Sequence, residues 1–319
     1  MNKKICITIG DIEGIGLELL IKLYLKNKIK NFIFFTNFKI FNTYLKKNRI
    51  KISINLINKN RYNAKKLNIY DFDAKDKINN TVLSIINSYK YCIKNDQKGI
   101  ITLPVNKKKI LKYQKNFTGH TELFEKLSNS RITNMLFIHK NLIISTLTTH
   151  VKIKNLIKQI KKKNYIYDKV SVLNKTLKED FNIKKPKILV SGLNPHAGED
   201  GILGEEEIKY IYPQIIRLKK NNIKVNGPVS GDAILIEKNL KKYNCFLFIF
   251  HDQALIPFKY ISKFKGINYT SNLKLIRVSP DHGTAYDLVG KNIAKEDSIK
   301  NCFSFIERIY KNKKIDKNK

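Results

Sequence analysis

The chain has few cysteines and lacks long apolar runs. Its four cysteines (Cys6, Cys92, Cys245 and Cys302) are far apart and form no CxxC pair, which is typical of reduced thiols in a cytoplasmic protein. No apolar run reaches the roughly 18 residues that a membrane-spanning helix needs, so we expect no transmembrane segment. The N-terminal segment lacks the apolar stretch and cleavage site of a signal peptide, so we expect a cytoplasmic location.

Acidic residues are also scarce. The chain has 26 Asp and Glu against 62 Lys and Arg, a formal net charge of +36, which can indicate nucleic-acid binding. However, the excess is in Lys, is spread along the chain, and accompanies abundant Ile, Asn, Phe and Tyr, so an A- and T-rich genome explains it. We interpret the densest basic stretch, residues 152–163, as a solvated helix face. We therefore expect weak polyanion binding and no specific nucleic-acid partner.

The fold class follows from alternation of segments. With 319 residues, the chain suffices for one large α/β domain or two smaller ones, and it has no internal repeat or linker rich in Pro, Gly or Ser. Alternating strand-like and helix-like segments predict an α/β protein with a largely parallel sheet. Predicted strands are residues 4–9, 31–36, 51–57, 99–105, 135–138 and 142–147, the last two forming a hairpin. Predicted helices are residues 15–26, 77–94, 120–127, 205–220, 232–242 and 297–311, followed by a frayed tail.

Three of the six histidines, His150, His196 and His251, each follow an apolar, β-rich run. In an α/β fold, ligands bind in loops beyond the carboxyl ends of strands. Three imidazoles gathered there could form a metal site with open coordination positions, although any one of them alone could be purely structural. His196 also lies in a long Gly-rich loop, and long ordered loops are usually functional.

Two carboxylates lie near these histidines in the sequence. Asp252 directly follows His251 and could orient its imidazole, ligate a metal or accept a proton. Asp232 lies at the start of a predicted helix, where it could be a functional carboxylate or only an N-cap.

Several motifs could bind anions. Residues 10–18, GDIEGIGLE, join a predicted strand to a helix, but the third glycine of a dinucleotide fingerprint is replaced by Leu19, so a purely structural turn is equally plausible. Lys107 follows a strand and could hold an anion or be a surface lysine. His120 and Thr121 begin a helix where free N–H groups could bind phosphate or carboxylate, and a capping role would explain only the threonine.

The C-terminal third adds a basic trio and another small-residue turn. Lys259, Asn268 and Arg277 could clamp a phosphate or carboxylate, although single basic residues prove little in so basic a chain. The segment DHGTAYDLVG, residues 281–290, could lie against a nucleotide, and His282 could contact a cofactor or simply pack.

In order, these motifs resemble the 4-hydroxythreonine-4-phosphate dehydrogenase family of vitamin B6 synthesis. The collinear resemblance runs from about residue 7 to about residue 290, and its most specific parts are GLNPHAGE and HDQ followed by DHGTA. It implies two α/β/α domains with a cleft between them, similar to isocitrate and isopropylmalate dehydrogenases, and a homodimer whose subunits share the active site. We place the first domain at residues 1–108 with 255–319, and the second at residues 109–254.

The resemblance also implies roles for individual residues. The metal ligands would be His150, His196 and His251. The substrate contacts would be His120, Thr121, Lys259, Asn268 and Arg277. Asp232 and Asp252 would be catalytic carboxylates near the metal, and Lys107 is a further candidate for charge stabilisation. The cofactor-binding turn would include His282, Gly283 and Asp287.

The implied reaction is oxidation of 4-phosphooxy-L-threonine with NAD or NADP and a divalent metal (Zn, Co or Mg). Its product, 2-amino-3-oxo-4-phosphooxybutanoate, would decarboxylate to 3-amino-2-oxopropyl phosphate. The alternatives are a 4-phospho-D-threonate or erythronate dehydrogenase, a polyanion-binding protein, and a metal-dependent hydrolase that needs no NAD.

The chain departs from the family's motifs at a few positions. The family's GDPAGIGPE reads GDIEGIGLE here, with Ile12, Glu13 and Leu17 as replacements; HDQGL reads HDQAL and GPLPAD reads GPVSGD. None of these changes removes an implied ligand.

Overall fold

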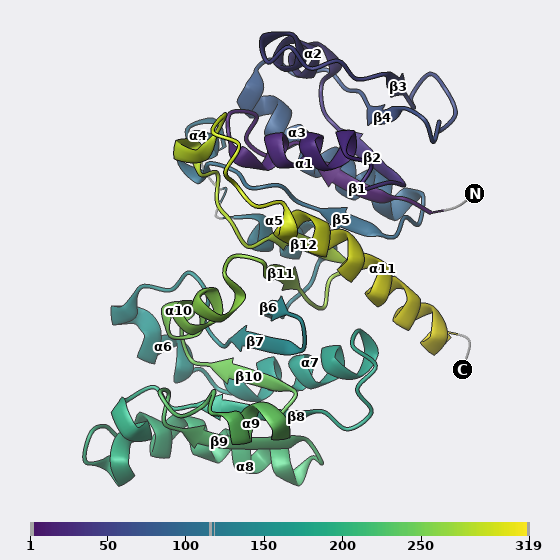
Figure 1. Cartoon of the computed structure of the whole chain (residues 1–319). Helices are drawn as coiled ribbons and strands as arrows, with labels where there is room; N and C mark the ends of the chain where they lie inside the picture. The colour runs from purple at the N-terminus through teal and green to yellow at the C-terminus, as the bar shows by residue number, and fades with distance from the viewer. Residues whose placement is uncertain (1–2, 115–116, 118, 318–319) are drawn as a thin grey trace. The chain divides into compact units, whose positions relative to one another are not determined.

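The computed structural model describes residues 3–114, 117 and 119–317 (Figure 1). It divides into two compact units, Met1–Asn129 with Leu273–Tyr310 and Ser130–Asn272 with Lys311–Lys319. These units assign residues 109–129, 255–272 and 311–319 differently from the sequence-based domain boundaries, which stay a prediction. Each unit combines a sheet with helices, so the predicted α/β class is confirmed.

The first unit contains a parallel sheet of apolar strands. Its strand order is β3-β4-β2-β1-β5-β12, and the pairings are parallel. The β2 sequence FIFF is buried throughout, as expected for a strand covered on both faces. The strands are β1 (Ile5–Thr8), β2 (Phe32–Phe35), β3 (Ile54–Leu56), β4 (Leu67–Tyr70), β5 (Gly99–Ile101) and β12 (Arg277–Pro280).

The helices of this unit begin at side-chain caps or turns. Asp76 accepts hydrogen bonds from the backbone N–H groups of Ile78 and Asn79 and starts the longest helix lying wholly within the unit; such a cap contributes about 1 kcal/mol. The helices are α1 (Ile15–Leu25), α2 (Phe38–Lys47), α3 (Lys77–Lys94), α4 (Lys107–Tyr113), α5 (His120–Ser128), the 3₁₀ turn η4 (Tyr286–Leu288) and α11 (Asp297–Lys317). From Lys311 onward, α11 belongs to the second unit.

The second unit has a mixed sheet of order β11-β6-β7-β10-β8-β9. The β6–β7 hairpin and the β11–β6 pair are antiparallel, whereas β7, β10, β8 and β9 are parallel neighbours. The strands are β6 (Met135–His139), β7 (Leu142–Thr146), β8 (Lys187–Ser191), β9 (Lys224–Val229), β10 (Cys245–Phe248) and β11 (Ile267–Thr270). The helices are η1 (Ile153–Asn155), α6 (Leu156–Ile160), α7 (Tyr165–Glu179), η2 (Pro195–Gly201), η3 (Glu207–Ile211), α8 (Tyr212–Lys220), α9 (Glu237–Lys242) and α10 (His251–Ser262).

Two sequence predictions in the second unit are wrong. The helix expected over residues 232–242 begins only at Glu237, because a turn places Ile234 in the apolar core and the Asn239 side chain donates to the carbonyls of that turn. Asp232 is therefore not an N-cap. The expected frayed tail is helical as far as Lys317, since Asn312 and Lys313 both contact Asp180.

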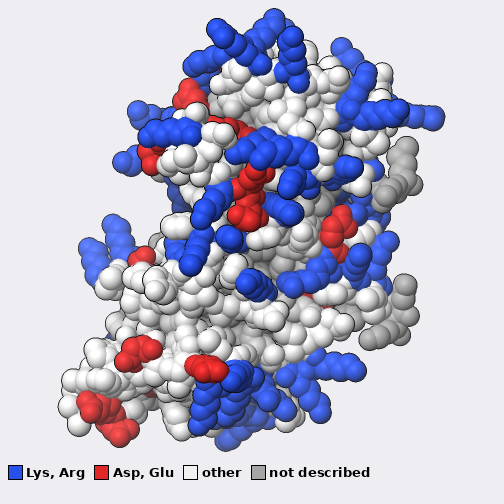
Figure 2. Space-filling model, in the orientation of Figure 1, with Lys and Arg blue, Asp and Glu red and all other residues white. Residues whose placement is uncertain are grey.

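Charge is distributed broadly over the surface. Lys and Arg side chains are scattered over the face seen in Figure 2, with acidic side chains among them. Within residues 152–163 only Leu156–Ile160 form an α-helix; Leu156 and Ile160 are buried, whereas Ile153 is 75% exposed, so the helix is shorter than predicted. None of the described helices has the length and apolarity needed to span a membrane. The four cysteines are free and buried, as predicted.

Candidate functional site

The three histidines singled out in the sequence follow three adjacent parallel strands of the second unit. Strand β10 lies between β7 and β8 and pairs with both. His150 comes after β7, His251 begins α10 after β10, and His196 lies in the loop after β8. Because parallel strands end at the same edge of a sheet, their topology directs all three loops to one side.

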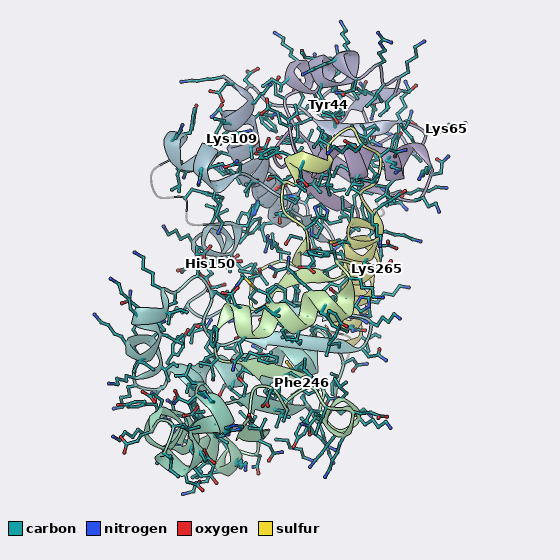
Figure 3. The ribbon with its side chains drawn as sticks, turned by 60° about the vertical axis from the view of Figure 1, so that its left-hand side comes forward. Tyr44, Lys65, Lys109, His150, Phe246 and Lys265 are labelled. Atoms are coloured by element: carbon teal, nitrogen blue, oxygen red, sulfur yellow. The ribbon has the colours of Figure 1, made fainter. Side chains whose placement is uncertain are left out.

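His150 and His251 are neighbours. Their ring centroids are 5.9 Å apart (Figure 3 labels His150). Nδ1 of His251 lies 3.2 Å from Oδ1 of Asp252, so this carboxylate can orient the imidazole, one of the three roles that the sequence leaves open. The side chains of His150 and Asp252 are exposed, and that of His251 is partly exposed.

His196 lies in a strained loop beside Asp232. Residues 196–200 all have positive φ, between 43° and 86°, which costs roughly 1–2 kcal/mol for each residue that carries a Cβ. The Asp232 carboxylate accepts a hydrogen bond from the Ser230 hydroxyl, and this bond, with a smaller contribution from His196, lowers the pKa of Asp232.

The donor set matches a divalent metal in type but is not preassembled. Among the described residues, no three His, Cys, Asp or Glu side chains are grouped closely enough to hold an ion. The structure brings His150, His251 and Asp252 together and places His196 near Asp232. Three imidazoles at one sheet edge are the ligands that Zn and Co prefer, so the residues present fit such an ion by chemistry and topology.

A separate cationic cluster occupies the first unit. Arg277, on β12, is 2% exposed, and its Nε and Nη2 atoms donate to Thr102 Oγ1 at 3.0 and 2.6 Å. Burial lowers the pKa of Arg277 to about 10, and the guanidinium lies 5.9 Å from the Phe124 ring centroid. A desolvated guanidinium of this kind is suited to bind a carboxylate or phosphate.

His120 and Lys107 belong to the same cluster. The His120 Nε2 atom is buried and, among the described residues, has no hydrogen-bond partner. Burial, then the charges of Arg277 and Lys107, hold the pKa of His120 well below its usual range. A Cβ at Gly119 would lie 3.3 Å from Lys107 Nζ, so this lysine flanks the turn before His120.

Thr121 is buried in the first turn of α5 and is not its cap. The N-cap is Gly119, which has no capping side chain. Thr121 thus lies beside His120 in the chain, where the predicted anion contact would need it.

The other two predicted substrate contacts, Lys259 and Asn268, lie in the second unit. Lys259 is on α10, with its Nζ 4.9 Å from the Phe264 ring centroid. Asn268 is on β11, and its Oδ1 is buried without a hydrogen-bond partner in the described part of the chain. The five predicted substrate residues are therefore divided between the units.

The predicted cofactor turn, residues 281–290, packs against the glycine-containing turn of residues 10–18, here called the first glycine turn. Backbone N–H of Ile15 donates to the Thr284 carbonyl at 2.8 Å. Nδ1 of His282 lies 3.0 Å from the Gly283 carbonyl oxygen, and a Cβ at Gly283 would meet no atom within 4 Å. Asp287 is exposed in the η4 turn. This arrangement leaves Gly283 open to close approach by a ligand.

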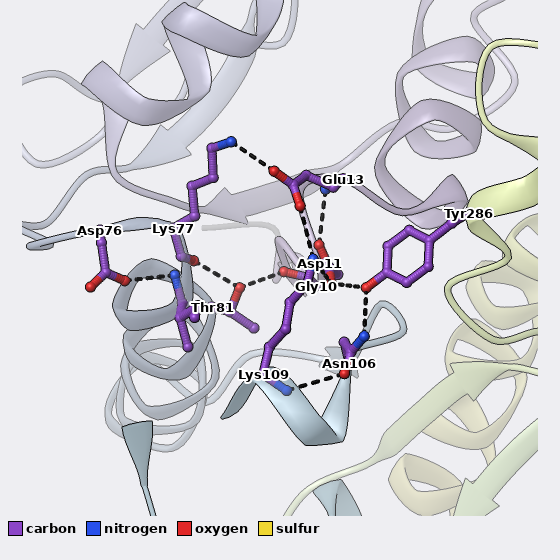
Figure 4. Close-up of polar contacts among 10 residues, drawn as sticks. Gly10, Asp11, Glu13, Asp76, Lys77, Thr81, Asn106, Lys109 and Tyr286 are labelled. Atoms are coloured by element: carbon purple, nitrogen blue, oxygen red, sulfur yellow. Dashed lines mark hydrogen bonds and ion pairs between the residues drawn. The ribbon is translucent and has the colours of Figure 1, made fainter. Parts of the chain in front are cut away.

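Sequence reasoning missed the polar network that joins these two turns (Figure 4). The Tyr286 hydroxyl donates to Asp11 Oδ2 at 2.5 Å and accepts from Asn106 Nδ2 at 2.9 Å. Lys109 Nζ lies 3.3 Å from Asp11 Oδ2 and 2.8 Å from Glu13 Oε2. The members are far apart in the chain, so no local spacing could have indicated the network.

Glu13, one of the departures from the family pattern, is central to this network. Its carboxylate pairs with Lys77 as well as Lys109, each at 2.8 Å. Hydrogen bonds from Lys109 and then Lys77 lower the pKa of Glu13 to about 2. The altered first turn is therefore held by ion pairs.

A cavity of about 1200 Å³ opens beside the network in the first unit. Its apolar lining includes Ile12, Ile40, Ile78 and Ile110. Asp11, Ile12 and Glu13 of the 10–18 motif line it, whereas none of the predicted metal, substrate, catalytic or cofactor residues does.

Comparisons with known proteins place these features in context. Residues 28–306 match the sequence model of the family described as pyridoxal phosphate biosynthetic protein PdxA. A 4-hydroxythreonine-4-phosphate dehydrogenase from Aquifex aeolicus is 37% identical over 320 residues, covering 96% of this chain and 98% of that protein. The crystal structure of 4-hydroxythreonine-4-phosphate dehydrogenase from Klebsiella pneumoniae has a TM-score of 0.82 and 25% identity, covering 97% of this chain and 98% of its own.

One further relative carries a different name. A Bradyrhizobium diazoefficiens protein, provisionally named D-threonate 4-phosphate dehydrogenase, is 34% identical over 221 residues. That match covers 66% of this chain and 64% of that protein. Both names describe dehydrogenases that act on a phosphorylated hydroxy acid.

Proposed function

The chain belongs to the PdxA family of pyridoxal phosphate biosynthetic proteins, and from this membership we propose that it is an NAD(P)-dependent 4-hydroxythreonine-4-phosphate dehydrogenase. It is an oxidoreductase. A bound nicotinamide would accept the hydride from the substrate's carbinol carbon, and the hydroxyl proton would be released. The resulting 2-amino-3-oxo-4-phosphooxybutanoate loses carbon dioxide because its new ketone accepts the electron pair, which gives 3-amino-2-oxopropyl phosphate.

The cationic cluster of the first unit supports binding of an anionic substrate. Arg277 offers a buried guanidinium, and the unsatisfied His120 Nε2 beside it can donate to or accept from a substrate oxygen. Lys107 adds positive charge next to the same turn. With Thr121, and with Lys259 and Asn268 from the second unit, these residues would hold the phosphate and carboxylate and position the carbinol carbon.

His150, His196 and His251 would hold the divalent metal, either Zn, Co or Mg. When bound, the ion would polarise the substrate hydroxyl and lower its pKa. Asp252 keeps the His251 ring oriented through its 3.2 Å contact. Asp252 and Asp232 are the candidate acceptors of the hydroxyl proton, because both are carboxylates beside the histidine loops.

The nicotinamide cofactor would lie against the turn that contains His282, Gly283 and Asp287, where the missing Cβ of Gly283 permits close approach. We also propose a cytoplasmic location and a homodimer whose subunits share the active site. The proposed domain boundaries lie at residues 108/109 and 254/255. The match to the family over residues 28–306 carries the proposal.

The main alternative is oxidation of 4-phospho-D-threonate or erythronate, which the name of the Bradyrhizobium relative favours. Such a substrate has the same phosphate but no amine. The decisive experiment compares amino and non-amino substrates side by side with NAD and NADP, following reduced nicotinamide by absorbance.

We expect the amino substrate to have the higher kcat/KM. A higher value for the non-amino acid would transfer the assignment to the alternative. Turnover of substrate without nicotinamide reduction would refute both and indicate a hydrolase.

A further inference from the structure

Glu207 is a buried carboxylate beneath the loop that carries His196. It is 3% exposed and begins the π-helical turn η3, a distortion that is frequent at functional sites. No ion pair found among the described residues involves it. Its two carboxylate oxygens are satisfied by hydrogen bonds instead.

Those contacts come from the start of the His196 loop. Glu207 Oε1 accepts hydrogen bonds from backbone N–H of Leu193 at 2.6 Å and of Asn194 at 2.8 Å. Glu207 Oε2 accepts from Asn194 Nδ2 at 2.9 Å. Three donors on two consecutive residues thus converge on one carboxylate, and bonds to an ionised acceptor are about twice as strong as neutral ones.

Glycines allow the loop to close over this carboxylate. A Cβ at Gly192 would lie 3.1 Å from Glu207 Oε1, and a Cβ at Gly198 would lie 2.9 Å from Glu207 Oε2. Between these glycines lies His196, within the left-handed segment. The loop is therefore built around Glu207 on both sides of His196.

A second set of contacts joins the base of the loop to Gln253 of α10 and to Ile249, just after β10. Gln253 Nε2 donates to the Gly192 carbonyl at 2.9 Å, and Gln253 Oε1 accepts from Ile249 N–H at 3.0 Å. Glu207 holds Leu193 and Asn194, the two residues through which the chain runs from this base toward His196.

We propose that Glu207 is a positioning residue that holds the left-handed loop in the conformation presenting His196 to a divalent metal. This inference rests on the proposed metal role of His196. Outer contacts that orient metal ligands typically change affinity by about 10- to 100-fold when removed.

The test is Glu207→Gln, which keeps the size of the side chain but replaces one acceptor oxygen with an NH₂ group. We expect Co²⁺ affinity, measured by calorimetric titration, to fall about 10- to 100-fold, with a changed visible absorption spectrum of the bound Co²⁺. The matched control is Glu205→Gln, two residues away, whose exposed carboxylate pairs only with Lys209 among the described contacts. It should bind Co²⁺ like the unmodified chain.

Equal affinity and spectrum in Glu207→Gln and the unmodified chain would overturn the positioning role. If Glu207→Gln does not fold, Glu207→Asp keeps the charge but shortens the reach, and Co²⁺ affinity unchanged in that variant would also overturn it. An unmodified chain that binds no Co²⁺ would refute the proposed metal site itself, so the two failures are distinguishable.

Discussion

At the scale of single residues, the burial of Arg277 makes a strong prediction. Arg277→Lys should raise KM for the phosphorylated substrate about 10- to 100-fold, the equivalent of 1.5–3 kcal/mol for lost charge-assisted hydrogen bonds. An ammonium in the same desolvated place would also release its proton more readily than the guanidinium, whose own pKa is already lowered to about 10. Steady-state kinetics with varied substrate measure the effect.

The control for this variant is Arg308→Lys, which changes an exposed arginine on α11 of the same unit. It should leave KM within about twofold, as expected for surface substitutions. An unchanged substrate KM in Arg277→Lys would remove Arg277 from the substrate site.

The lowered pKa of His120 predicts how the free energy of unfolding depends on pH. Its pKa in the folded chain is well below the unfolded value of about 6.5, so below pH 6.5 the unfolded chain binds a proton that the folded chain does not. This residue therefore destabilises the fold progressively as pH falls from about 6.5, by up to about 1.4 kcal/mol per pH unit.

His120→Gln should remove this slope. We expect its Tm relative to the unmodified chain to rise as the pH is lowered from 7 to 5, measured by thermal unfolding at each pH. A Tm difference that stays constant over this range would show that His120 is not held neutral by its surroundings.

At the scale of elements, sequence patterns predicted segments whose own residues decide their structure. The apolar run of β2 and the helical periodicity of α3 were found because burial of their side chains is written into local spacing. The helix α2 and the strand β4 were not predicted. The side-chain cap of α2, where Asn37 accepts from Ile40 N–H, was a signal that could have revealed this helix.

The candidate site was predictable where it depends on strand ends. His150, His196 and His251 were placed after strands from sequence alone, and the structure shows those strands to be adjacent. The contacts of Tyr286 with Asp11 and Asn106, and of Glu207 with its loop, depend on tertiary packing of residues whose spacing in the chain carries no signal.

The link between the first glycine turn and the 281–290 turn yields an element-scale prediction. Tyr286→Phe removes the hydroxyl that bonds Asp11 and Asn106 but keeps the ring, which lies 4.9 Å from Lys109 Nζ. If the turn contacts the nicotinamide cofactor, KM for NAD should rise about 5- to 30-fold, matching 1–2 kcal/mol for the lost bonds. The kcat should change less than twofold.

Tyr260→Phe, a change at a tyrosine that is 85% exposed, is the matched control and should leave both constants unaltered. Kinetics with varied NAD at saturating substrate separate the two effects. If KM for NAD is the same in Tyr286→Phe, the network has no role in cofactor binding.

At the scale of the whole molecule, each unit depends on its own apolar cluster. In the first unit the cluster includes Phe35, Ile85 and Phe124, and in the second it includes Phe246, Phe248 and Phe258. The cationic cluster and the 281–290 turn belong to the first unit, whereas the three histidines belong to the second.

The last prediction starts from the net charge of +36 and distinguishes an enzyme from a polyanion-binding protein. The basic side chains in Figure 2 are spread over the whole face and are not confined to one patch, so binding to duplex DNA should consist of nonspecific phosphate contacts. Each contact releases counterions, so affinity should fall by about 10³-fold or more between about 50 and 200 mM salt. This loss of affinity is measured by fluorescence anisotropy of labelled DNA duplexes of unrelated sequence, titrated at several salt concentrations. The dehydrogenase rate, assayed in parallel at the same salt concentrations, should be mostly kept. Sequence-dependent binding that persists at about 200 mM salt would instead identify a nucleic-acid-binding surface, because only contacts to base edges and DNA shape discriminate between sequences.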